Sequence, residues 1–139
     1  MKILVIGSGG REHALIKALL KSPSKPHVIC SPGNAGIAKE VACVHIDGTV
    51  DYCKNNRIDL VIVGPEQPLV DGLADELRAV GIAVFGPDKG AAAVEASKDF
   101  TKKLCDKYNL PTAAYKTCSS QEEALAYLKE QGAPIVVKA

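Results

Sequence analysis

The first residues that could do chemistry stand in the stretch GSGGREH, directly after a short hydrophobic run at the start of the chain. Gly7, Gly9 and Gly10 leave backbone N–H groups unobstructed at the start of a helix, where a phosphate or carboxylate is favoured. Arg11 adds a cation in the first helical turn, where the helix dipole disfavours one unless an anion is bound. Glu12 stands where the dinucleotide fingerprint has its third glycine. The stretch therefore predicts a site for a small anion, with an unliganded tight turn as the alternative.

Two further turns carry residues of the same kind. In SPGNAG, glycines around Asn34, Gly36 among them, favour close approach of the backbone and supply further N–H donors. In VGPEQPL, Glu66 directly follows Pro65, and its carboxylate can accept hydrogen bonds from sugar hydroxyls or from an amine. An ordinary loop and an acid at a helix start are the alternatives. Together the turns offer anion donors, a cation and an acceptor, which suits a small phosphorylated sugar or polyol.

Lysines form the last group of candidates. The stretch EASKDFTKKL contains Lys98, Lys102 and Lys103, and we expect Lys102 and Lys103 to lie on a solvated helix face. Lys138 ends the apolar run PIVVK, which is predicted to be a strand. An unpaired lysine is costly there unless it reaches a partner, and a nucleotide phosphate would serve. In the alternative, its stem is buried and its ammonium group extends to solvent.

The three turns lie where predicted strands give way to helices, and strands and helices alternate along this part of the chain. The runs KILVIG, HVICSPG, IDLVIVG and IAVFGP predict strands, and the segments REHALIKALLKS, TVDYCKNN and PLVDGLADELRAVG predict helices, the second with Thr49 as its N-cap. This alternation favours right-handed βαβ crossovers and a parallel sheet covered on both faces. Ligands bind such sheets beyond the carboxyl ends of the strands, where the three turns would lie.

The pattern changes after residue 87. The stretch 88–109 is predicted to be helical, with no intervening strand. LPTAAYKTCSS predicts a loop and a strand, and APIVVKA predicts a further strand. Between them, SSQEEALAYLKEQG predicts a helix with Ser119 or Ser120 as N-cap and Glu122 or Glu123 as capping-box partner. We therefore expect an α/β domain over residues 1–100 and the start of another domain over residues 101–139.

Composition excludes several classes of protein. The 139 residues carry 17 basic and 16 acidic side chains, a net charge of +1, which argues against general nucleic-acid binding. No apolar run approaches the roughly 20 residues that span a bilayer. The five cysteines form no C-x-x-C pair and the three histidines show no ligand spacing. We expect a cytoplasmic protein with reduced thiols, no metal site in this segment, and no nucleic-acid or membrane partner.

The ordered set of motifs resembles the N-terminal part of one enzyme family. The pieces GSGGREHAL, PGNAG, VGPEQPLVDGL, FGP, EASKDFTK and PIVVKA are similar, in order and over essentially the whole chain, to the phosphoribosylamine–glycine ligases, which are ATP-grasp enzymes. The resemblance implies a three-layer, Rossmann-like (pre-ATP-grasp) domain with a parallel sheet, followed by the beginning of an ATP-grasp domain. A nicotinamide-dinucleotide-binding domain of a dehydrogenase and a non-catalytic module that binds a sugar phosphate or nucleotide are the alternatives.

The family's reaction belongs to de novo purine biosynthesis. ATP phosphorylates the carboxylate of glycine, and the amine of 5-phosphoribosylamine displaces phosphate to form glycinamide ribonucleotide. The residues implied to hold the phosphoribosyl group are Gly9, Gly10, Arg11, Asn34, Gly36, Pro65 and Glu66. Lys98 and Lys138 are implied to contact the ATP phosphates, where two cations offset charge that grows during phosphoryl transfer. The glycine site and the ligands of Mg²⁺ (or Mn²⁺) are expected downstream of Ala139, so the chain alone is expected to be inactive, and no catalytic residue is assigned within it.

Overall fold

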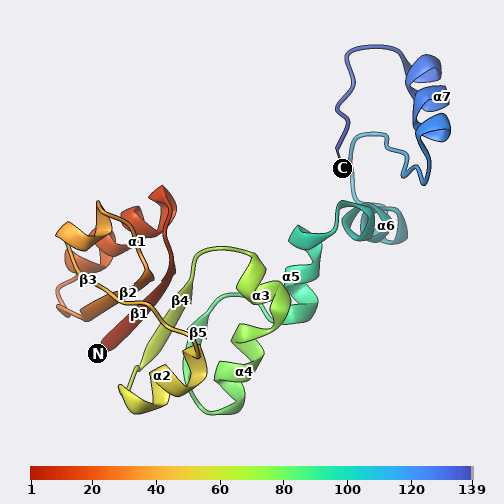
Figure 1. Cartoon of the computed structure of the whole chain (residues 1–139). Helices are drawn as coiled ribbons and strands as arrows, with labels where there is room; N and C mark the ends of the chain where they lie inside the picture. Colours follow the sequence, from red (N-terminus) through yellow and green to blue (C-terminus); the bar gives the residue numbers. More distant parts are fainter. Residues whose placement is uncertain (139) are drawn as a thin grey trace. The chain divides into compact units, whose positions relative to one another are not determined.

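The computed structural model describes residues 1–138, which divide into two compact units, Met1–Ser97 and a second unit that starts at Lys98. The first unit is built on a sheet of five parallel strands in the order β3-β2-β1-β4-β5 (Figure 1). The strands are β1 (Lys2–Gly7), β2 (His27–Pro32), β3 (Ala42–Cys43), β4 (Leu60–Val63) and β5 (Ala83–Phe85). The predicted α/β class with a parallel sheet is therefore confirmed.

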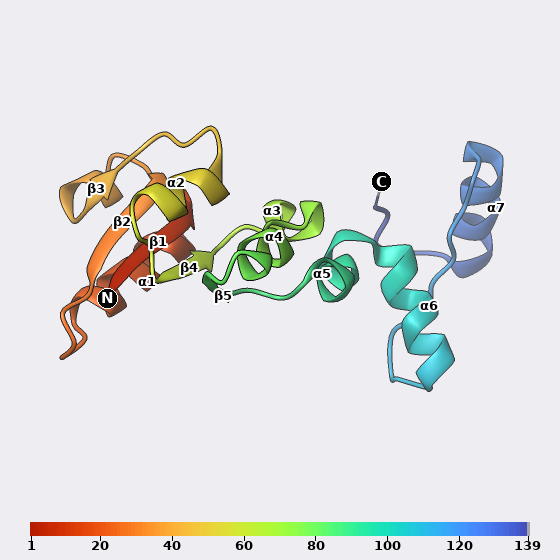
Figure 2. The same cartoon turned by 90° about the horizontal axis from the view of Figure 1, so that it is seen from below.

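Helices cover both faces of this sheet, which gives three layers (Figure 2). The first unit contains the helices α1 (Gly10–Leu20), η1 (Ile37–Lys39), α2 (Thr49–Asn55), α3 (Gln67–Asp71), α4 (Leu73–Ala79) and α5 (Lys89–Ala96). Successive residues of a strand point to opposite faces, so Val5 packs with Ile16 of α1 on one side of β1. Leu4 packs with Leu77 of α4 on the other side. All four side chains are fully buried.

The strand order creates a switch point between β1 and β4. From β1 the chain adds β2 and β3 on one side of the sheet, whereas β4 and β5 lie on the other. Crevices at such points, beyond the carboxyl ends of the strands, are where open α/β sheets bind ligands. Here Ile6 of β1 pairs with Val63 of β4, and the N–H of Gly64 donates to the carbonyl of Ile6 at 3.0 Å. The turns after β1 and β4 therefore leave the sheet side by side.

Several boundaries differ from the sequence-based predictions. The helix predicted for PLVDGLADELRAVG is wrong as a single element, because Gly72 takes a left-handed conformation (φ +108°) and separates α3 from α4. The stretch 88–109 is helical without a strand, as predicted, and the extended backbone of Ser97 (φ −126°, ψ 110°) ends α5 and divides it into two helices. Thr49 is the first residue of α2 and Gly48 is its N-cap. The two-residue strand β3 was not predicted, since it is too short to show a pattern.

The second unit contains the helices α6 (Lys98–Tyr108) and α7 (Gln121–Gln131). The start of α7 follows the predicted capping: Ser120 is the N-cap, and its hydroxyl accepts from the N–H of Glu123 at 3.2 Å. The carboxylate of Glu123 in turn accepts from the N–H of Ser119 at 3.0 Å. Serine and glutamate thus satisfy N–H groups at the helix start reciprocally.

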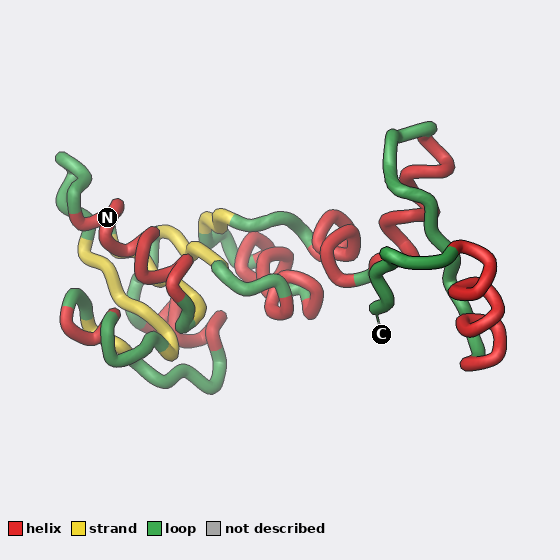
Figure 3. The backbone as a smooth tube through the Cα atoms, turned by 90° about the horizontal axis from the view of Figure 1, so that it is seen from above, coloured by secondary structure: helices red, strands yellow, loops and turns green. Residues whose placement is uncertain are grey.

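The two strands predicted in this unit do not form within residues 98–138, which Figure 3 shows as helices and loops. A strand needs a neighbouring strand for its backbone hydrogen bonds, and this part of the chain supplies none. Val136 and Val137 are consequently 79% and 69% exposed. The loop that follows α6 is held instead by side chains: Lys102 donates to the hydroxyl of Thr112 at 2.6 Å, and Thr117 donates to Asp99 at 2.8 Å. Ala139, the end of the second predicted strand, lies outside the described residues.

Candidate functional site

The turn from β1 to α1 places unpaired N–H groups at the carboxyl edge of the sheet. Gly7 has φ +131°, a conformation that side chains rarely adopt, and turns the chain out of the strand. Gly9 is the N-cap of α1, with extended backbone. Within the described residues, the N–H groups of Gly10 and Arg11 have no acceptor. These donors lie at the positive end of an 11-residue helix, where an anion is favoured.

A buried carboxylate fills the crevice beside this turn. Glu12 is only 4% exposed, and its side chain lies against two glycines at the ends of neighbouring strands. A Cβ atom added to Gly7 would come within 2.6 Å of Glu12 Cγ, and one added to Gly64 would come within 2.6 Å of Glu12 Cδ. Both distances are shorter than any real carbon contact. Glycine is therefore required at both positions because Glu12 occupies the space between β1 and β4.

Glu12 also takes one of the predicted anion donors. Its Oε2 accepts from the N–H of Gly9 at 2.6 Å, and its Oε1 accepts from Arg11 Nε at 3.0 Å. Burial raises the pKa of Glu12, but the two hydrogen bonds and the charge of Arg11 lower it by more, so the pKa lies below its ordinary value of 4.5. The group is ionised at neutral pH. A bound phosphate would therefore meet Gly10 and Arg11 rather than the N–H of Gly9.

Residues from the first and third predicted turns meet in one cleft of about 530 Å³ at this edge. Arg11, 63% exposed in its side chain, lines it from α1, and Glu66 lines it from the residue before α3. Pro65, half-buried, lies between Glu66 and the end of β4. The remaining lining residues are Leu15, Ile62, Val63, Gly64, Leu69, Phe85, Pro87, Ala92 and Glu95. One cation, that of Arg11, and two carboxylates, those of Glu66 and Glu95, thus line a mostly apolar cleft at the switch point.

The cleft is also lined by two residues to which the sequence assigned no role, Phe85 and Glu95. Glu95 lies on α5 and begins the motif EASKDFTK, in which only Lys98 was predicted to contact a ligand. Phe85 ends β5 and is exposed. The motif FGP, which begins with Phe85, is a fourth turn at a strand end. The rule that places ligands at the carboxyl edge of a parallel sheet could have drawn attention to it.

The second predicted turn lies beside the first but does not line this cleft. The side-chain amide of Asn34 donates to the carbonyl of Ser8 at 2.6 Å, and its oxygen accepts from the N–H groups of Gly36 and Ile37 at 2.8 and 2.9 Å. Asn34 therefore ties the loop after β2 to the turn after β1 and accepts from two N–H groups at the start of η1. A direct contact of Asn34 or Gly36 with a ligand stays a prediction.

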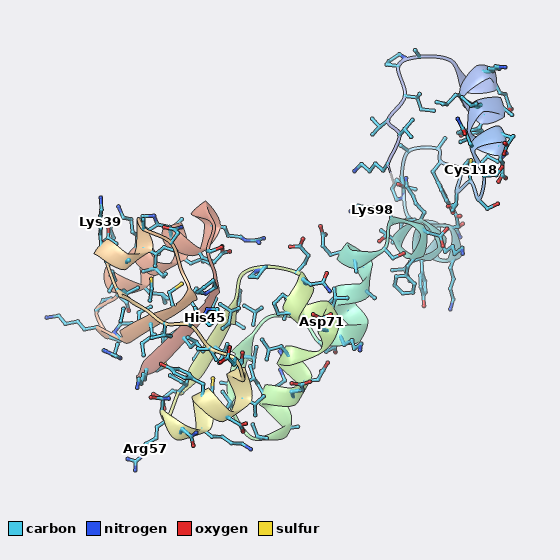
Figure 4. The ribbon with its side chains drawn as sticks, in the orientation of Figure 1. Lys39, His45, Arg57, Asp71, Lys98 and Cys118 are labelled. Carbon is cyan, nitrogen blue, oxygen red and sulfur yellow. The ribbon has the colours of Figure 1, made fainter. Side chains whose placement is uncertain are left out.

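The two lysines predicted to contact ATP belong to the second unit. Lys98 begins α6 (Figure 4) and Lys138 follows the exposed valines, and both side chains are exposed. Neither ammonium group has an ion-pair partner within residues 1–138. By contrast, Lys103 pairs with Asp99 at 2.7 Å, and Lys102 holds the loop after α6. Lys98 and Lys138 thus remain available for an anion, and their contact with ATP stays a prediction.

Comparison with protein families divides the chain close to the boundary between its two units. Residues 1–95 match the family described as "Phosphoribosylglycinamide synthetase, N domain". Residues 96–139 match "Phosphoribosylglycinamide synthetase, ATP-grasp (A) domain". The predicted boundary at residue 100 stays a prediction.

Individual relatives agree with this family. The chain is 54% identical over 144 residues to a phosphoribosylamine–glycine ligase of Brucella melitensis, and 49% identical over 146 residues to that of Escherichia coli K12. Each alignment covers 100% of this chain but only 34% of the relative, so the chain spans about a third of the length of these proteins. No helix in residues 1–138 is both long enough and apolar enough to cross a membrane.

Solved structures show the same arrangement. The crystal structure of phosphoribosylamine–glycine ligase from Thermotoga maritima matches with a TM-score of 0.71 and 25% identity, and covers 94% of this chain and 30% of that one. The biotin carboxylase domain of a single-chain bacterial carboxylase matches with a TM-score of 0.64 and 18% identity, covering 99% of this chain and 36% of that one. At such low identity the second likeness concerns the fold alone.

Proposed function

The chain belongs to the phosphoribosylglycinamide synthetase family, and from this premise we propose that it forms the N-terminal part of a ligase that joins glycine to 5-phosphoribosylamine. The product is glycinamide ribonucleotide, a step of purine biosynthesis in the cytoplasm, with ATP converted to ADP and phosphate. One observation carries the proposal: Arg11 and Glu66, from separate turns, line a single cleft beside the free N–H groups at the start of α1.

The cleft suits the phosphoribosyl part of the amine substrate. Its phosphate would accept hydrogen bonds from the N–H groups of Gly10 and Arg11 and from the guanidinium of Arg11, which recognises phosphate oxygens in a fixed planar geometry. Glu66 would accept from a ribose hydroxyl or from the amine. The loop around Asn34 would support the phosphate turn through its bond to Ser8.

The match to an ATP-grasp domain implies use of ATP. In the proposed reaction, a glycine carboxylate oxygen attacks the γ-phosphorus and ADP leaves. The amine of phosphoribosylamine then attacks the acyl carbon, loses a proton and expels inorganic phosphate. Lys98 and Lys138 would contact the ATP phosphates. Mg²⁺ (or Mn²⁺) would accompany the ATP phosphates, and we propose that its protein ligands lie in the part of the ATP-grasp domain beyond this segment.

The cleft can be tested on the chain itself with ribose 5-phosphate, which keeps the phosphate and the hydroxyls of the substrate. Calorimetric titration of the wild-type chain should give saturable binding at one site. Arg11→Ala should weaken it about 10- to 150-fold, the value of a charge-assisted contact. Lys21→Ala, at the opposite end of α1, removes the same charge and should leave affinity unchanged. Equal effects of the two variants would mean that net charge, not the cleft, attracts the ligand.

A further inference from the structure

Glu12 is the buried acid of the site, and the proposed reaction leaves it without a role. Its carboxylate has two partners, the N–H of Gly9 and the Nε of Arg11. In the dinucleotide fingerprint this position is a glycine. Burying a charged group is costly, and a glutamate is rarely found buried without a specific partner. What this residue does for its partners therefore needs an explanation.

The first effect concerns the orientation of Arg11. Adjacent residues on a helix point in different directions and do not normally face each other. For Arg11 Nε to reach Glu12 Oε1 at 3.0 Å, the guanidinium must fold back over the start of α1. The guanidinium is planar and rigid, so fixing Nε also fixes the two Nη groups. Within residues 1–138 these make no other hydrogen bond, and Arg11 lines the cleft that it shares with Glu66.

The second effect concerns space and charge. Glu12 fills the crevice between the ends of β1 and β4, where Gly7 and Gly64 leave room for no other group. In a dinucleotide site the pyrophosphate lies on glycine backbone at this point. Here the crevice is closed, its first N–H donor is taken, and the occupying group is negatively charged. A phosphate group can be bound only further out, at Gly10 and Arg11.

We propose that Glu12 is a positioning and specificity-determining residue: it orients Arg11 toward a single phosphate monoester at the start of α1 and excludes a pyrophosphate from the crevice. The inference rests on the proposed function, because it takes the cleft to be the phosphoribosyl site. It extends that function by saying why the cleft selects a sugar monophosphate over a dinucleotide.

A double-mutant cycle on the whole chain tests the positioning role. Glu12→Gln keeps the volume of the side chain and removes its charge. With ribose 5-phosphate as ligand, it should weaken binding about 2- to 13-fold, the cost of immobilising one long side chain on binding. In an Arg11→Ala background the same change should have no further effect. Glu40→Gln is the matched control. It removes an acid that pairs with Lys17, a residue of α1 like Glu12, and the variant should bind as the wild type does.

Readouts from the wild-type chain keep the inference testable if Glu12→Gln fails to fold by circular dichroism. The Arg11 Nε–H resonance should exchange slowly with water and should shift with a pKa below 4.5, as Glu12 takes up its proton. An Arg11 resonance that does not sense this titration overturns the positioning role. ADP-ribose should not displace ribose 5-phosphate, and displacement at comparable concentration overturns the exclusion of pyrophosphate.

The outcomes separate this inference from the proposed function. A folded wild-type chain that does not bind ribose 5-phosphate contradicts the phosphoribosyl cleft and the role of Glu12 together. Binding that is weakened by Arg11→Ala but not by Glu12→Gln leaves the cleft intact and overturns the inference alone. If the fold-losses in affinity caused by Arg11→Ala and Glu12→Gln multiply in the double variant, the two residues act independently, and the inference alone is again overturned.

Discussion

Replacing Gly64 by alanine should destabilise the first unit through one contact that can be identified. The added Cβ would lie 2.6 Å from both Cγ and Cδ of Glu12, and Glu12 is held in place by Gly9 and Arg11. Overpacking a filled site costs about 1–3 kcal/mol, and alanine returns about 0.4–1 kcal/mol through the unfolded state. The difference lies between about 0 and 2.6 kcal/mol. Because the carboxylate cannot move without losing both partners, we expect the upper part of this range, a net loss of about 1–2.5 kcal/mol. For a unit of this size the melting temperature should fall by roughly 4–20 °C.

Thermal melting followed by circular dichroism measures this effect, and the same turn supplies the control. A Cβ added to Gly10 meets nothing within 4 Å, and Gly10 begins a helix, so Gly10→Ala should raise stability by up to about 1 kcal/mol. Adding Gly64→Ala to a Glu12→Ala chain should cost little, because the group that it meets is gone. If Gly64→Ala melts like Gly10→Ala, or costs as much without Glu12 as with it, Glu12 does not fill the crevice and the reasoning is refuted.

Four further predictions concern the titration of Glu12, the buried cysteines, Asn34 and Lys138. The lowered pKa of Glu12 means that its stabilisation is complete above pH 4.5 and is lost as pH falls through the folded-state pKa, so the denaturant midpoint should drop there by more in the wild type than in Glu12→Gln. Burial raises the pKa of Cys30 and of Cys53 to about 11, so mass spectrometry should find both unalkylated by iodoacetamide in the native chain at pH 8 and modified in urea. Asn34→Ala should lower the free energy of unfolding, measured in urea, by about 1–3 kcal/mol, because it removes the hydrogen bond to Ser8 and the acceptor of two N–H groups at the start of η1. Lys138→Met should leave the melting temperature unchanged, and in the complete ligase it should reduce ATP affinity or turnover.

The architecture of the first unit could be predicted because its signals are local. β-Branched runs that end in glycine identify buried parallel strands, and the order of strands and helices leaves few topologies. The same rule puts the turns at one edge, which is why Arg11 and Glu66 line one cleft. The second unit lacked this advantage. Ile135–Val137 have strand composition, but a strand forms only with a partner, and composition does not reveal whether one is present.

The details of the site were less predictable for a related reason. Asn34 is a typical turn residue, and the sequence cannot tell whether its amide faces a ligand or, as here, the carbonyl of Ser8. In the sequence, Glu12 indicated only that the third glycine of the dinucleotide fingerprint is absent. Only the pairing of β1 with β4 brings Gly64 opposite Gly7 and makes the space that Glu12 fills. Gly64 lies 52 residues from Glu12 in the sequence and carries no side chain that could indicate the contact. A departure from a motif therefore becomes interpretable once the residues that make room for it are known.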